Sequence, residues 1–389
     1  MDFTLPDTAN DVGGLADDIV ARVVTPERVA ELEETGAPID DRLWRASGDA
    51  GLVGLELPSA VTGESGADLT MVENVAIATT LGAALARVPF GPHAMVAAPV
   101  IARSGTAGLV ADLGPSLAVG ATIGTFGIDE DPGADLLTPH TALTADGDGW
   151  RLSGTKIGVP YARAADLIVV TAASPEGVRA VVVAAGDDDV HVTDLAATGL
   201  TPVAAVEFDG VAVSADRILT GAETTVLDLA LRAELALCAD QTGVVDRALA
   251  LTAEYARERE QFGRPIGSFQ AVAQRLADGY IDAQALSLTT TQAAWLYAQS
   301  AGERSSDAPV DVPVGFADLE VAVHTAKFWA CEAGHRVAHT AVHVHGGVGL
   351  DTSHPIHRYF LRAKQNEFDL AAVPVTLRRI GDALAAAPA

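Results

Sequence analysis

One segment of the chain carries a residue type suited to binding phosphate. Residues 255–270 read YAREREQFGRPIGSFQ, and Arg259 stands just ahead of a glycine and proline turn and of a new helix. A planar guanidinium offers paired N–H donors that match two phosphate oxygens, and a loop before a helix start suits that contact. The arginine also lies among Glu254, Glu258 and Glu260, so an ordinary solvated surface charge is the competing interpretation.

A second segment would let the backbone approach a ligand closely. Residues 341–364 read AVHVHGGVGLDTSHPIHRYFLRAK, and the paired Gly346 and Gly347 have no Cβ to hold a ligand away. Four histidines, beginning with His343, lie in this segment at spacings of two, nine and three residues. These spacings match no standard zinc pattern and no cysteine joins them, so we expect no bound metal.

The elements that must position these residues change in type along the chain. Residues 1–115 are rich in alanine and leucine and predict helices with short breaks, such as 40–50, which should stop at Gly51. Residues 116–222 carry short β-branched runs separated by turn signals. Several short strands at such spacing predict a small all-β barrel or sandwich.

Residues 223–389 predict a C-terminal helical bundle. One long helical pattern covers 225–257, and a second should begin at an N-cap, Ser268. A third pattern covers 315–343 and a fourth 374–386. Long antiparallel helices of this kind form a four-helix bundle. We therefore expect an α+β multidomain chain with an N-terminal helical domain, a middle β domain and a C-terminal helical bundle.

Composition excludes several classes of partner. The chain has 389 residues, 49% of them hydrophobic, and a formal net charge of −27 from 52 acidic and 25 basic side chains. Such a charge repels nucleic acid and anionic membrane. No window has the roughly 18 apolar residues of a membrane span and the N-terminus lacks a signal-peptide pattern, so we expect a cytoplasmic protein. Cys238 and Cys331 are expected to be buried free thiols.

The first segment closely resembles the R-x-x-F-G-x-P-I-x-x-F-Q signature of the acyl-CoA dehydrogenase family. Arg259, Phe262 and Gln270 stand at its arginine, first phenylalanine and glutamine positions, within seven matched positions of twelve. The resemblance implies that FAD is the cofactor. In the family the arginine binds the FAD pyrophosphate of the neighbouring subunit and the phenylalanine lies beside that dinucleotide, so we expect these three residues to contact FAD.

The second segment resembles the Q-x-x-G-G-x-G stretch that ends the third bundle helix in the same family. The usual glutamine is His343 here, and histidine still supplies one hydrogen bond. The resemblance implies that His343, Gly346 and Gly347 contact FAD. The H-G-G form looks most like the actinobacterial branch, several members of which act on steroid side-chain or other bulky CoA thioesters, so lipid or steroid degradation is the expected setting.

The catalytic base that the family uses has no obvious counterpart. The family reaction removes a proton from Cα with a carboxylate and a hydride from Cβ with flavin, which leaves a 2,3 double bond. A gapless alignment puts Leu370 at the usual glutamate position, beside Asp369, and Ala233 at the less common position, beside Glu234. The helical neighbours of Glu234 offer it no ion pair. It is thus either a carboxylate in water or a desolvated base with a raised pKa, and we name it as the candidate base.

The β domain also departs from the family pattern. Residues 158–160 (GVP) replace the Trp-Ile-Thr that packs on the flavin ring, and residues 128–135 (IDEDPGAD) replace V-T-E-P-G-A-G-S-D. Glycine cannot stack and proline has no N–H to donate, so either the pocket is roomier or its flavin site is lost. The chain keeps the elements that act on a neighbour's FAD and lacks those that hold its own.

Three functions stay open. The first is a subunit of an FAD-dependent acyl-CoA dehydrogenase that works on a bulky acyl-CoA, with a homologous subunit in a homo- or heterotetramer and an electron-transfer flavoprotein as acceptor. The second is a catalytically deficient partner subunit that completes the FAD site of a homologous active subunit. The third is a relative with other chemistry, an acyl-CoA oxidase or a flavin monooxygenase.

Overall fold

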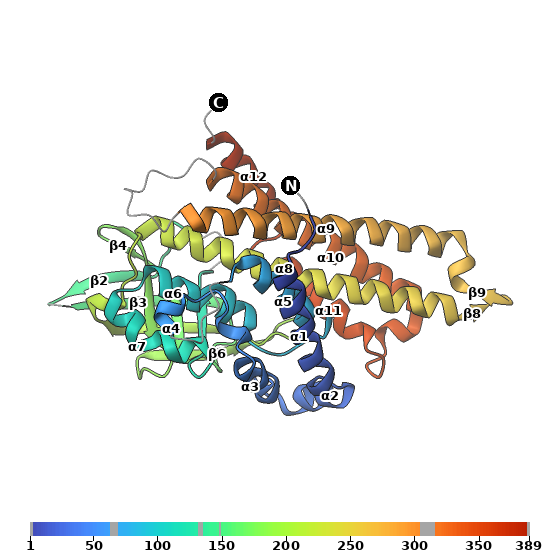
Figure 1. Cartoon of the computed structure of the whole chain (residues 1–389), viewed down its shortest axis with the longest axis horizontal. Helices are drawn as coiled ribbons and strands as arrows, with labels where there is room; N and C mark the ends of the chain where they lie inside the picture. The colour runs from blue at the N-terminus through green and yellow to red at the C-terminus, as the bar shows by residue number, and fades with distance from the viewer. Residues whose placement is uncertain (1–2, 63–68, 131–134, 148, 304–315, 387–389) are drawn as a thin grey trace.

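The computed structural model describes residues 3–62, 69–130, 135–147, 149–303 and 316–386. Helices extend to Ala118, strands occupy Gly124 to Val213, and helices follow from Ala222. Figure 1 shows the strands at one end of the long C-terminal helices, with α6 (Ala98–Ser104) and α7 (Ala107–Ala118) at the same end, and α1 (Asp7–Val23) and α5 (Met71–Ala83) beside the middle of those helices. The expected fold class, helical domain, central β domain and helical bundle, is confirmed.

The first part is helical because its sequence contains strong start and stop signals. Helix α3 begins at Asp40, whose carboxylate accepts two backbone N–H groups, and it ends before Gly51, at φ +73°, as the sequence predicts. Helix α5 begins with a capping box between Thr70 and Glu73. The helices are α1 (Asp7–Val23), α2 (Pro26–Thr35), α3 (Asp41–Asp49), α4 (Ser59–Thr62), α5 (Met71–Ala83), the π-helical η3 (Gly91–Ala97), α6 (Ala98–Ser104) and α7 (Ala107–Ala118).

The second part is a mixed seven-stranded sheet with strand order β1-β4-β2-β3-β7-β6, and β5 pairs with β4 outside this path. Side chains alternate between its faces: in β4, Ile168 and Val170 join the core of the β domain, whereas Leu167 and Val169 pack toward the helices. The strands are β1 (Gly124–Gly127), β2 (Ala142–Asp146), β3 (Gly149–Pro160), β4 (Leu167–Ser174), β5 (Gly177–Ala184), β6 (Val190–Leu195) and β7 (Val203–Val213).

The third part contains the long helices. Helices α8 and α9 are joined by a short ribbon, β8 and β9, at the end of the molecule away from the sheet (Figure 1). Helix α10 passes into a 3₁₀ segment, η6, that contains the paired glycines. The elements are α8 (Ala222–Glu258), β8 (Glu260–Gln261), β9 (Arg264–Pro265), α9 (Gln270–Glu303), α10 (Phe316–His345), η6 (Gly346–Leu350), α11 (Ile356–Phe368) and α12 (Val373–Ala386).

One predicted boundary in the bundle is wrong. Ser268 does not cap α9: it lies in a short 3₁₀ turn, η5 (Ile266–Ser268), and its hydroxyl donates to the carbonyl of Pro265 at 2.7 Å. The backbone is extended at Phe269, and α9 begins at Gln270. The Ser268 hydroxyl is therefore used in the turn that precedes the helix, and it is not free to cap α9.

The N-terminal helices are locked onto the bundle where α5 crosses α8. A Cβ on Gly243 would lie 1.9 Å from the carbonyl oxygen of Thr79, and one on Gly82 would lie 2.3 Å from that of Asp240. Only glycine permits this close backbone approach. Nearby, the buried Arg232 donates to both carboxylate oxygens of the buried Glu56, so the two domains share one core.

Candidate functional site

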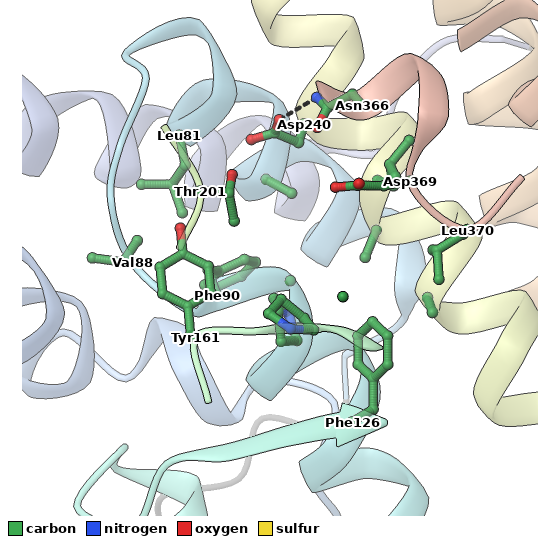
Figure 2. Close-up of a pocket in the computed structure, with 18 of the residues that line it drawn as sticks. Leu81, Val88, Phe90, Phe126, Tyr161, Thr201, Asp240, Asn366, Asp369 and Leu370 are labelled. Carbon is green, nitrogen blue, oxygen red and sulfur yellow. Dashed lines mark hydrogen bonds between the residues drawn. The ribbon is translucent and has the colours of Figure 1, made fainter. Parts of the chain in front are cut away.

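A pocket lies where the three parts of the chain meet (Figure 2). It contains about 850 Å³ of empty space, mouth included. Its walls come from α5, η3, β1, the end of β3, α8 and the end of α11. Leu81, Val88, Phe90 and Phe126 make one side apolar, as Figure 2 shows. We call it the interdomain pocket.

The other side of the interdomain pocket is polar and internally paired. Arg362 donates to both carboxylate oxygens of Asp240, at 2.9 and 2.8 Å, and also to the hydroxyl of Thr201. The amide of Asn366 donates to Asp240 at 2.7 Å (Figure 2). Burial raises the pKa of Tyr161, although the nearby Arg362 opposes that shift. Arg362, Asp240, Thr201 and Asn366 satisfy one another and so fix the shape of the pocket, whereas the buried hydroxyl of Tyr161 makes no hydrogen bond among the described residues.

Two other carboxyl groups line the interdomain pocket, and neither forms an ion pair like that of Asp240 with Arg362. Asp369 follows α11, and burial raises its pKa to about 6. Burial also raises the pKa of Asp129, while Arg379 and Lys156 oppose that shift. Leu370, the residue aligned with the usual glutamate, lines the pocket beside Asp369 and has a φ of +65°. The pocket therefore holds a carboxyl with a raised pKa, next to the residue that the gapless alignment pairs with the family's glutamate.

Glu234 is buried beside the interdomain pocket and does not line it, whereas its neighbour Ala233 does. Its carboxylate accepts from Arg379 of α12 and contacts Nδ1 of His324 of α10 at 2.7 Å. Burial raises the pKa of Glu234, but His324, Arg379 and Lys327 together outweigh it and lower that pKa. The carboxylate is thus neither in water nor unpaired: its partners come from other helices, where helical spacing gives no sign of them. Its role as base remains a prediction.

The residues at 158–160 do not fit a flavin ring in this chain's own pocket. Gly158 has a φ of +64° and no atom within 4 Å of where its Cβ would be. Val159 is buried in the β-domain core, and Pro160 lines the pocket without an N–H. The pairing of β3 with β7 shifts register between Lys156 and Val159, so this segment leaves the regular ladder. No side-chain ring faces the pocket from residues 158–160, and Pro160 offers it no backbone N–H.

The residues predicted to contact the dinucleotide lie elsewhere, at the far end of the bundle. Arg259 ends α8, and Phe262 at the tip of the ribbon is 92% exposed with a φ of +55°. Gly346 has a φ of +62° and no atom within 4 Å of its missing Cβ. The ring of Tyr255 stacks on His345 at 4.3 Å, which joins the end of α8 to the start of η6. Six predicted residues meet at this bundle end, all of them exposed: Arg259, Phe262, Gln270, His343, Gly346 and Gly347.

The structure therefore separates the predicted site residues into two groups. Glu234 and Arg259 lie on the same helix, 25 positions apart, which is about 37 Å at the rise of an α-helix. At this separation, the two groups of residues cannot contact the same end of one ligand together. Sequence reasoning also missed the polar side of the interdomain pocket: Tyr161, Thr201, Asp240 and Arg362 come from separate parts of the chain. Of these four, Arg362 alone stands in a segment singled out from the sequence, residues 341–364, and it was given no role there.

Other predicted properties concern metals, thiols and membrane. Among the described residues, no three His, Cys, Asp or Glu side chains group closely enough to hold a metal ion. Cys238 and Cys331 are buried and free. None of the described helices is long and apolar enough to cross a bilayer.

Family models match both helical parts of the chain. The acyl-CoA dehydrogenase N-terminal domain matches residues 7–121, and the acyl-CoA dehydrogenase C-terminal domain matches residues 230–368. The chain is 46% identical over 390 residues to the acyl-CoA dehydrogenase FadE27 of Mycobacterium tuberculosis, with 100% of both chains covered.

Two solved structures extend this similarity to three dimensions. A chain of the ChsE4-ChsE5 complex from Mycobacterium tuberculosis superposes with a TM-score of 0.89 at 45% identity, over 100% of both chains. A chain of a Tcur3481-Tcur3483 steroid ACAD variant superposes with a TM-score of 0.87 at 35% identity, over 98% of this chain and 99% of that one.

Proposed function

The chain belongs to the acyl-CoA dehydrogenase family, and we propose that it is one subunit of an FAD-dependent enzyme that introduces a 2,3 double bond into a bulky acyl-CoA thioester. Enzymes of this family are oxidoreductases that act on the CH–CH group of acyl-CoA, and FAD supplies the oxidising power when bound. A homologous subunit completes the oligomer, and an electron-transfer flavoprotein accepts the electrons.

The bulky substrate is supported by the shape of the interdomain pocket and by a relative. Gly158 takes the place of an aromatic side chain and leaves open space at the pocket. One similar structure is described as a steroid ACAD. A glycine where the family carries a large ring widens a pocket by the volume of that ring, which suits a wide acyl group.

The observation that carries the proposal is the separation of the two groups of site residues. The bundle end exposes Arg259, Phe262 and Gly346 on one surface, as contacts made to another subunit's dinucleotide require. The interdomain pocket lacks the flavin contacts at 158–160, and Glu234 is held in ion pairs. We therefore infer that this chain contributes the dinucleotide contacts of a heterotetramer and that the homologous subunit contributes the flavin pocket and base.

A second candidate is a self-sufficient enzyme with Asp369 as base, and a specific observation favours it. Asp369 lines the interdomain pocket, and its pKa is raised to about 6. A carboxylate with a pKa near the working pH is an effective general base. This candidate requires that flavin bind in the interdomain pocket of this chain despite residues 158–160.

The visible spectrum of the purified protein separates the two candidates. The chain is purified alone, and again after co-expression with a homologous acyl-CoA dehydrogenase subunit. We expect the chain alone to be colourless and the complex to contain one FAD per pair of subunits. One FAD per chain in the isolated protein, with dehydrogenation activity lost in Asp369→Asn, contradicts the heterotetramer and supports the second candidate.

A further inference from the structure

A second hollow lies where α1, α5, α8 and α9 meet, and it shares no lining residue with the interdomain pocket. It contains about 740 Å³ of empty space, mouth included. We call it the threonine cleft because hydroxyl side chains from three helices line it: Thr79, Thr80, Thr242, Ser287, Thr290 and Thr291. The inference drawn from it does not depend on the proposed function.

Three of these hydroxyls are restricted to accepting hydrogen bonds from a ligand. Thr79, Thr242 and Thr291 each donate their proton to a helix backbone carbonyl, at 3.3, 2.8 and 2.8 Å. A hydroxyl has one proton and two lone pairs, so once the proton is used only acceptor positions remain. The lining of the threonine cleft is therefore rich in acceptors.

Two further groups have no partner among the described residues. Thr290 is 1% exposed, and its hydroxyl makes no hydrogen bond there. A buried polar group without a partner costs free energy that a ligand can return. Asp246 lines the same cleft, where part of its surface is open to solvent while the protein atoms around it desolvate its carboxylate. No hydrogen bond or ion pair joins it to another described side chain.

The rest of the lining is apolar, with Leu5, Ala9 and Val75 on the wall formed by α1 and α5. Acceptors, a carboxylate and an apolar wall together match a ligand with several N–H donors, a positive charge and a carbon chain. The empty space is far larger than a single metal ion. We propose that the threonine cleft binds a small primary alkylammonium ion, with the ammonium group on Asp246 and the threonine oxygens and the carbon chain against the apolar wall.

Calorimetric titration with n-butylammonium chloride tests the proposal, using the protein as purified, with its partner subunit if the two co-purify, in phosphate buffer at pH 7.5. We expect saturable binding at one site per copy of this chain. Asp246→Asn should weaken it about tenfold or more, since a charge-assisted hydrogen bond contributes on the order of 1.5–3 kcal/mol. Thr290→Val should weaken it less. Asp216→Asn, an exposed aspartate in the β domain, serves as the matched control and should change nothing.

Affinity should also fall as the pH drops below 6, because protein atoms around Asp246 raise its pKa to about 6 and the neutral carboxyl loses its attraction for a cation. Asp246 is the one titratable side chain among the described residues lining the cleft. Absence of saturable binding overturns the proposal, as does equal binding by Asp246→Asn with an unchanged circular dichroism spectrum. Equal binding of n-butanol overturns the role of charge, and displacement by equimolar potassium chloride makes the cleft a site for an inorganic cation instead.

Discussion

The interdomain pocket and the bundle end differ in how their side chains are held. Several polar groups in and beside the interdomain pocket are paired: Arg362 binds Asp240 in the lining, and Arg379 binds Glu234 beside it. At the bundle end, Phe262 and Gly346 are exposed. A buried, paired group maintains the fold, whereas an exposed aromatic residue on a strained turn has no such role within the chain.

The contrast favours the bundle end as the part of this chain that contacts a ligand. Phe262 has a φ of +55° in the two-residue turn between β8 and β9, and its ring meets the ring of Phe269 edge-to-face, yet it is still 92% exposed. Most of this ring therefore has nothing to cover it in the isolated chain. A second subunit's dinucleotide would give the ring a surface to cover. The interdomain pocket keeps a cavity and loses the flavin contacts. Each prediction below tests this contrast between the two regions.

The largest expected effect is on stability, from a charge buried near the interdomain pocket. Arg232 is fully buried and holds Glu56 with two hydrogen bonds. Arg232→Met should lower the free energy of unfolding by about 3–5 kcal/mol, because it leaves a buried carboxylate with reduced compensation. Arg259→Met, at the exposed bundle end, should change it by less than about 0.5 kcal/mol. Urea unfolding of both variants measures this, and an equal loss would mean that Arg259 is structural.

The next effect is on FAD affinity of the complex with the homologous subunit. Arg259→Ala should weaken FAD binding about tenfold to a hundredfold, because a charge-assisted pair to phosphate contributes on the order of 1.5–3 kcal/mol. Arg257→Ala, two positions earlier on α8 and also exposed, is the matched control. Flavin fluorescence during titration of apo-complex gives the constants. Unchanged affinity in Arg259→Ala would remove the bundle end from the dinucleotide site.

The Glu234→Gln variant tests whether Glu234 is the catalytic base or a structural residue that joins helices. Its carboxylate joins α8 to α12 through Arg379 and to α10 through His324, so we expect a loss of roughly 1–3 kcal/mol in stability with turnover of the complex retained. The folded-state pKa of Glu234 is lowered from 4.5. Its contribution to stability is therefore present above about pH 4.5 and is lost as the pH falls through the lower folded-state value. Denaturant titrations of Glu234→Gln and the unsubstituted chain at several pH values should converge in acid. Loss of turnover without loss of stability would identify Glu234 as the base.

The residues at the bundle end could be singled out from the sequence, whereas the lining of the interdomain pocket could not, for a physical reason. The residues predicted to contact the dinucleotide fall in two short segments, so their spacing is itself the signal. Glu234, by contrast, takes its partners from 90 and 145 residues away, and the pairing of Arg362 with Asp240 spans 122 residues. Such contacts are created by the packing of α8, α10, α11 and α12, and helical periodicity describes only one helix at a time.

Fold elements show the same division. The stop of α3 at Gly51 was predictable because it is encoded in local backbone preference. The start of α9 was misplaced because two local preferences competed at Ser268, a helix cap and a turn, and the turn won. No separate helix was predicted over 356–368, where α11 lies, yet α11 supplies the arginine and asparagine of the interdomain pocket. The missed helix is thus the reason that the polar side of the pocket was missed.

The smallest expected effect concerns Asp369, and it tests whether the interdomain pocket still favours a neutral carboxyl. Burial raises the folded-state pKa of Asp369 from 3.8 to about 6. For an acid, a raised folded-state pKa means that stability is lost as the pH rises from about 4 to 6 and stays lost above that. Asp369→Asn should therefore stabilise the chain by roughly 1–2 kcal/mol at pH 8 and by little at pH 4. Thermal unfolding at both pH values measures the difference, with Asp216→Asn as an exposed control. A stabilisation that is equal at both pH values would show that the carboxyl is not desolvated, and the interdomain pocket would then differ less from the bundle end than its geometry indicates.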